Sequence, residues 1–158
     1  MVEGIEPKGG IEPVRKVVQV RIAIEEAFRL FTEGMSTWWP LATYSVGAEK
    51  TMRCVFEGQV IGRIYEVQED GSRAEWGIVK LWDPPNAVAF TWYPGREPDT
   101  AQDVEVGFQS ILDGTELELV HHGWELLGNQ AQEIRAGYDS GWDYVLDHFV
   151  KMLVTDST

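Results

Sequence analysis

The chain has 158 residues, of which 44% are hydrophobic and 25% charged, values typical of one soluble globular domain with one core. Its formal net charge of −13 argues against binding to nucleic acid or to anionic membrane surfaces, because both rely on clustered lysine and arginine. The only cysteine, Cys54, cannot form an internal disulfide, and its apolar neighbours indicate a buried structural thiol. With no signal-peptide pattern and no membrane-spanning run, cytoplasm is the expected location.

Residues 1–13 are rich in glycine, proline and acidic side chains, which predicts a flexible leader ahead of a single domain over residues 14–155. The apolar alternation that follows, from Val18 to Ile22, is typical of a strand. A short helix is expected directly after it, with Glu25 and Glu26 in its first turn, where the helix dipole favours negative charge. The segment GMSTWWPL then predicts one more short helical turn, stopped by Pro40.

From Thr51 onward the sequence predicts about six strands separated by turns. Asp70-Gly71 and Asp113-Gly114 are hairpin signals between apolar runs. In DVEVGF and TELELVHH the apolar side chains alternate with acidic ones, so one side of this sheet is expected to face water and the other the core.

A long C-terminal helix is predicted by apolar residues that recur every three or four positions. They are Ile134, Tyr138, Trp142, Val145, Phe149 and Leu153, the stripe of a helix laid on a sheet. Gly137 and Gly141 interrupt this helix at a cost of up to about 1 kcal/mol each. Close approach to the sheet, room for a ligand, or a helix break near Gly137 would each explain them.

The element order predicts an α+β fold: one strand, two short helices, about six antiparallel strands and a long helix. Together with seven ordered stretches, this order resembles the START-like (SRPBCC) superfamily and its helix-grip fold. The stretches are EEAFRLFT, WWP, GRIYEVQEDG, WGIVKLWDPP, AFTW, HHGW and GYDSGWDYVL. Within the superfamily, the chain is most similar to the branch related to the heat-shock-protein-90 ATPase activator. The resemblance implies a seven-stranded antiparallel sheet wrapped around the C-terminal helix, with a cavity between them.

The resemblance also implies that this cavity holds a small, mostly apolar molecule, with no cofactor. Aromatic side chains of the strands, the short helices and the long helix are the expected lining. The candidate ligand-binding residues are Trp39, Tyr65, Trp76, Trp92, Phe108, His121 and Trp142. The same rings could equally form an ordinary packed core.

His121 is the candidate catalytic residue, as a general base or polar anchor on the buried face. A hydrogen-bonded core histidine is the alternative reading. Because His121 and His122 are neighbours on a strand, they point to opposite faces and cannot chelate one metal ion, so no metal site is expected. Glu66, Glu75 and Arg63 lie in strands of mixed polarity. A buried Arg–Glu pair among them could orient a polar ligand group, or these charges could lie on the strand surface, which is the commoner arrangement.

Three functions are therefore compatible with the sequence. The first is binding of a small apolar molecule. The second is a cyclase- or hydrolase-like enzyme that acts in the same cavity, although no familiar catalytic constellation is present. The third, implied by the activator resemblance alone, is a partner of an Hsp90-type chaperone.

Overall fold

The computed structural model of the chain describes residues 11–156. Its helices and strands are β1 (Val14–Val20), α1 (Ile24–Phe31), β2 (Thr51–Phe56), β3 (Arg63–Gln68), β4 (Arg73–Asp83), β5 (Ala87–Trp92), β6 (Gln102–Ile111), β7 (Gly114–His122) and α2 (Ala131–Asp156). Four short 3-10 turns lie between them: Met35–Thr37, Ala48–Lys50, Pro98–Thr100 and Trp124–Gln130. The predicted element order is confirmed.

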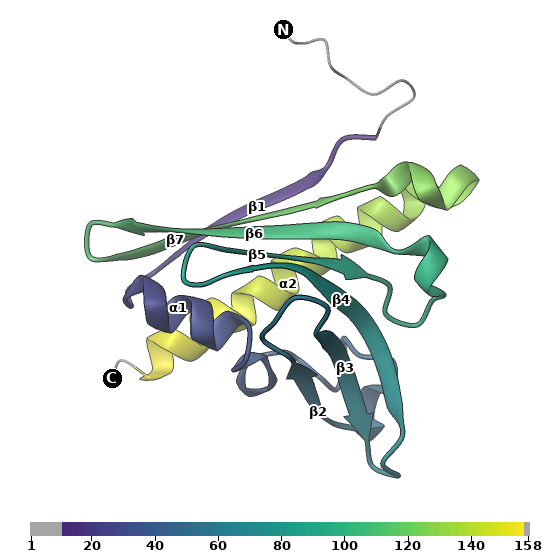
Figure 1. Ribbon diagram of the computed structural model, residues 1–158, viewed down its shortest axis with the longest axis horizontal. Coiled ribbons are helices and arrows are strands. Elements are labelled where there is room, and N and C mark those ends of the chain that lie inside the picture. Colours follow the sequence, from purple (N-terminus) through teal and green to yellow (C-terminus); the bar gives the residue numbers. More distant parts are fainter. Residues whose placement is uncertain (1–10, 157–158) are drawn as a thin grey trace, which may run out of the picture.

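The strands form one antiparallel seven-stranded sheet in the order β1-β7-β6-β5-β4-β3-β2. Every strand from β2 to β7 lies beside its neighbour in sequence, which is what hairpin connections produce. β1 closes the far edge by pairing with β7. The sheet curls around α2, which crosses its concave side diagonally (Figure 1). This is the helix-grip arrangement predicted from the sequence.

The two faces of the sheet divide as the alternation predicts. Val104, Val106 and Phe108 of β6 are buried toward α2, as are Leu117 and Leu119 of β7. The opposite face carries exposed polar pairs between neighbouring strands, and several of these are ionic. The buried face therefore supplies the core, and the acidic residues lie on the face exposed to solvent.

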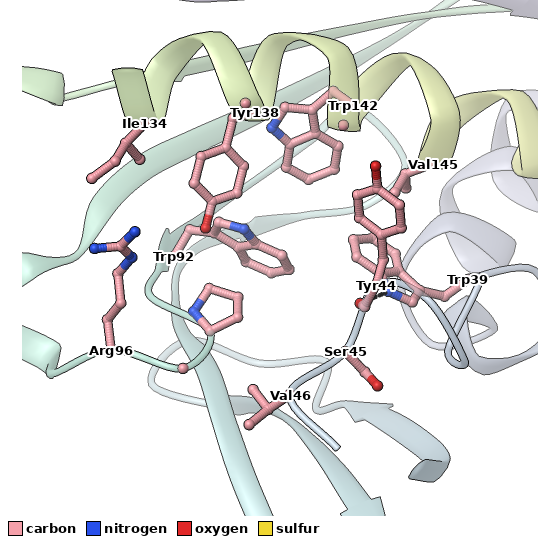
Figure 2. Close-up of a pocket in the computed structure, with 14 residues that line it drawn as sticks. Trp39, Tyr44, Ser45, Val46, Trp92, Arg96, Ile134, Tyr138, Trp142 and Val145 are labelled. Carbon is pink, nitrogen blue, oxygen red and sulfur yellow. Dashed lines mark hydrogen bonds between the residues drawn. The ribbon is translucent and has the colours of Figure 1, made fainter. Parts of the chain in front are cut away.

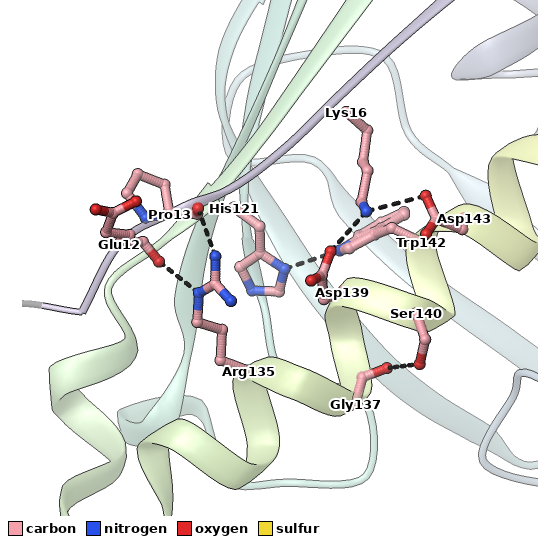
Figure 3. A network of polar contacts seen from close by, with 10 residues as sticks. All are labelled: Glu12, Pro13, Lys16, His121, Arg135, Gly137, Asp139, Ser140, Trp142 and Asp143. Carbon is pink, nitrogen blue, oxygen red and sulfur yellow. Dashed lines mark hydrogen bonds and ion pairs between the residues drawn. The ribbon is translucent and has the colours of Figure 1, made fainter.

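Helix α2 is tied to the sheet at its N-terminal half by polar contacts as well as by its apolar stripe. Lys16 of β1 pairs with Asp139 at 2.6 Å and with Asp143 at 2.9 Å. One turn earlier, Arg135 donates to the backbone carbonyls of Glu12 and Pro13 (Figure 3). The rest of the leader predicted for residues 1–13 lies outside the described residues. The helix runs unbroken through Gly137, so the predicted alternative of a break there is wrong.

Within residues 11–156, no helix is long and apolar enough to span a membrane.

Candidate functional site

A pocket of about 610 Å³ opens between α2 and two loops on the concave side of the sheet (Figure 2). Its volume falls within the range of small-molecule sites. One wall is the face of α2 that carries Gly137, Tyr138, Gly141 and Trp142. The opposite walls are the loop at residues 44–46 and the loop at residues 94–96, which follows β5.

Three indoles form the floor and sides of this pocket. Trp92 comes from the end of β5, Trp142 from α2, and Trp39 from the segment after α1. Their ring centroids lie 5.7–5.9 Å apart, close enough for the rings to contact one another. Trp76 packs behind Trp39 and Trp92, at 5.1 and 5.7 Å respectively, and is fully buried. These four tryptophans thus form one continuous cluster, and three of their rings reach the pocket.

The indole N–H groups of Trp39, Trp142 and Trp76 are hydrogen-bonded within the protein. Trp39 donates to the Tyr44 carbonyl at 2.7 Å, and Trp142 donates to Nδ1 of His121 at 2.9 Å. Trp76 donates to the Glu66 carboxylate at 2.7 Å. Because each donor is already bonded, Trp39 and Trp142 offer the pocket mainly flat apolar ring surface.

The glycines of α2 widen the pocket. A Cβ at Gly137 would meet no other atom within 4 Å, because the pocket lies next to it. A Cβ at Gly141 would approach Tyr44 to 3.2 Å, tighter than ordinary van der Waals contact. Tyr44 in turn stacks on Tyr144 of α2, with ring centroids 4.8 Å apart. Of the readings left open, room beside the helix accounts for Gly137, whereas Gly141 is explained by the close approach of Tyr44.

Of the seven residues predicted to bind ligand, Trp39, Trp92 and Trp142 line the pocket. The other four lie elsewhere. Trp76 is in the second layer of the aromatic cluster. Phe108 packs with Phe28 and Phe31 beneath α1. Tyr65 lies under the Arg73 guanidinium, 4.4 Å from the ring centroid, away from the pocket lining.

His121 is fully buried, and both of its ring nitrogens are hydrogen-bonded; Figure 3 shows the bond with Trp142. Nδ1 accepts the indole N–H of Trp142, so the ring proton resides on Nε2, which donates to Oε1 of Gln102 at 3.2 Å. Burial, with a smaller contribution from His122, lowers the pKa of His121 to about 3. The geometry is that of a neutral core histidine that holds Trp142 in place, and no nitrogen remains free to act as a general base.

Glu66 is also fully buried, and it supports the loop that forms one pocket wall. Its carboxylate accepts the backbone N–H groups of Val46 and Gly47, each at 2.7 Å, and the Trp76 indole N–H. Thr51 and Gln68 add two more hydrogen bonds at 3.0 Å. Burial raises the pKa of this carboxyl, but the hydrogen bonds outweigh it and the net pKa lies below the ordinary value.

The alternative of a buried Arg–Glu pair is wrong, whereas the alternative of strand-surface charges holds for Arg63 and Glu75. Arg63 lies on the outer face and pairs with Glu75 at 2.6 Å, whereas Glu66 has no cationic partner among the described residues. A register shift between Ile64 and Tyr65 leaves three successive side chains of β3 buried, so simple alternation could not assign the faces.

The described residues contain no cluster of three metal-ligating side chains. Burial raises the pKa of the Cys54 thiol to about 12, so it is not a thiolate nucleophile at neutral pH.

Comparison with known proteins places the chain in a family. The family described as Activator of Hsp90 ATPase homolog 1-like protein matches residues 21–154. The chain belongs to this family. None of the curated proteins matches the chain.

Solved structures similar to the chain differ in how much sequence they share with it. The anthrahydroquino-γ-pyrone synthase Txn09, determined as a complex, is 33% identical, with a TM-score of 0.57 over 82% of this chain and 88% of that one. The Aha1 dimer from Colwellia psychrerythraea is 15% identical, with a TM-score of 0.66 over 90% and 96%. Protein MLL2253 from Mesorhizobium loti is also 15% identical, with a TM-score of 0.65 over 92% and 98%. The last two share the fold, whereas the synthase also shares sequence.

Proposed function

We propose that this protein binds a flat, mostly apolar aromatic molecule in the pocket between α2 and the loops at residues 44–46 and 94–96. The observation that carries the proposal is the lining: Trp39 and Trp92 lie across the pocket from the face of α2, which carries the third indole, Trp142, and has no side chain at Gly137. Planar rings stack favourably on indoles, and the missing side chain at Gly137 leaves room for a ring to lie against the helix backbone.

Binding of a neutral bicyclic probe, methyl 2-naphthoate, tests this proposal by titration calorimetry. Saturable binding at one site per chain, with a negative heat-capacity change from apolar burial, is the expected result. Absence of saturable binding by this ester and by its parent acid would contradict the proposal.

The substitution Gly137→Ala should change ligand affinity and protein stability in opposite directions. Because the new methyl meets no atom within 4 Å and alanine favours helix, we expect the free energy of unfolding to rise by up to about 1 kcal/mol. The same methyl enters the pocket, so probe affinity should fall roughly tenfold. Ser140→Ala, on the same helix outside the pocket lining, is the matched control and should leave affinity unchanged. Unaltered affinity in Gly137→Ala would place the ligand elsewhere.

A second candidate function is ring formation on an aromatic substrate in the same pocket. The 33% identity with an anthrahydroquino-γ-pyrone synthase favours it. If so, incubation of the protein with an anthrahydroquinone precursor should yield a pyrone faster than incubation in buffer alone. Chromatography of the product measures both rates. A rate equal to that of buffer would exclude this reaction while leaving the binding proposal intact. The third function, partnership with an Hsp90-type chaperone, stays a prediction from the family name.

A further inference from the structure

The pocket differs in charge from the rest of the molecule. The chain has 26 acidic and 13 basic residues, yet no carboxylate is among the described residues that line the pocket. The single charged side chain in that lining is Arg96. An acidic protein thus has a pocket whose local charge is positive.

Arg96 is held at the pocket mouth by its backbone rather than by an ion pair. Its N–H donates to the Tyr93 carbonyl at 2.9 Å, which closes the turn after β5. The exposed side chain then reaches toward α2 beside Ile134 (Figure 2). Among residues 11–156, no carboxylate lies within ion-pair distance of this guanidinium, whereas Arg15, Arg29 and Arg63 each pair with a glutamate. The acidic residues that follow it, Glu97 and Asp99, lie outside the pocket lining.

A phenol lies close to the same guanidinium. The Tyr138 hydroxyl points toward Arg96 across the pocket mouth (Figure 2). Burial raises the pKa of Tyr138 and the neighbouring Arg96 opposes that shift, so the hydroxyl stays protonated at neutral pH. A neutral O–H and a guanidinium together present several hydrogen-bond donors at one end of an otherwise apolar pocket.

From this arrangement we infer that the ligand is an aromatic carboxylate, with its ring against the indoles and its carboxylate bound by Arg96 and Tyr138. The inference rests on the proposed function and adds the chemical class of the ligand. A guanidinium presents paired N–H donors that match the two oxygens of a carboxylate. The lining has no negative charge to repel the anion.

The test compares 2-naphthoate with methyl 2-naphthoate, which have the same rings and differ in charge. Titration calorimetry on the wild-type protein should give about tenfold tighter binding for the acid. In Arg96→Gln this preference should disappear, while saturable binding of the ester shows that the pocket is intact. Arg53→Gln removes one exposed arginine of β2 outside the pocket lining, and it should keep the preference. The preference should also shrink as salt is raised.

Three results would overturn the inference, and they are distinguishable. If both probes bind the wild-type protein with equal affinity, the pocket is an aromatic site without anion selectivity, and the proposed function survives. If neither probe binds, the proposed function fails and the ligand class fails with it. A preference for the acid that persists in Arg96→Gln would assign the anion to another group.

Discussion

Replacement of Glu66 by alanine is expected to lower the free energy of unfolding by about 3–5 kcal/mol. The substitution leaves the N–H groups of Val46, Gly47 and Trp76 without their acceptor, and these donors lie at or beneath the pocket wall. Buried donors that lose their partner cost their full desolvation penalty. Chemical denaturation monitored by tryptophan fluorescence measures the loss.

Glu118→Ala is the matched control for this experiment. Glu118 forms an exposed pair with Arg15 at 3.2 Å, and surface pairs of this kind contribute less than about 1 kcal/mol. Equal destabilisation by the two alanines would contradict the assigned role of Glu66. We also expect Glu66→Ala to weaken binding of methyl 2-naphthoate, because the loop at residues 44–46 loses its anchor to β3.

His121 is expected to make the protein steadily less stable as the pH falls. The unfolded chain binds a proton at this side chain below about pH 6.5, whereas the folded protein does so only near pH 3. Stability therefore has its full value above pH 6.5 and declines as the pH falls from 6.5 toward 3. Over the whole interval this side chain accounts for on the order of 4 kcal/mol.

The variant His121→Gln provides the comparison, since glutamine keeps one donor and one acceptor but does not titrate. This variant should be less stable than the wild type at pH 7. Between pH 4 and 6.5 its stability should depend less on pH than that of the wild type. NMR of the histidine side chains measures the protonation state of His121 directly. We expect its ring to remain in the Nε2–H tautomer between pH 4 and 6.5. Protonation of its ring near pH 6 would refute the assignment.

Glu66 also makes the folded protein less stable as the pH falls, but over a lower range of pH than His121. Because its folded-state pKa is depressed, its contribution is fully present above the ordinary glutamate pKa, about 4.3, and is lost as the pH falls through the folded value. Above pH 5, the slope of unfolding free energy against pH therefore reflects His121 rather than Glu66.

The fold was predictable because its signals are local and repeated. Alternation in β6 and β7 assigned the buried face, two Asp-Gly turns placed hairpins, and the apolar stripe of α2 identified the helix that the sheet wraps. These patterns arise from burial of one face of each element, and burial is what a periodic sequence encodes most directly.

The pocket was only partly predictable, because loops form half of it. Trp92 and Trp142 were identified by their place on a strand and on the long helix, and Trp39 by its place in a predicted helical turn, whereas Tyr44 and Arg96 lie in segments without periodicity. The paired glycines of α2 were the one signal in the sequence for the open helix face. Phe108 was misplaced relative to the pocket because facing the core does not specify which end of the sheet a side chain occupies.

The bonded indole N–H groups have a consequence for the thermodynamics of recognition. Trp39 and Trp142 are fixed through the Tyr44 carbonyl and the His121 ring, so their rotamers are set when the chain folds. A ligand that enters the pocket need not immobilise them, and less of its contact energy is lost to side-chain ordering. Such a site should accept a rigid planar guest with a small entropic penalty and discriminate poorly against guests of similar outline. Selectivity must then come from the few polar groups at its edge.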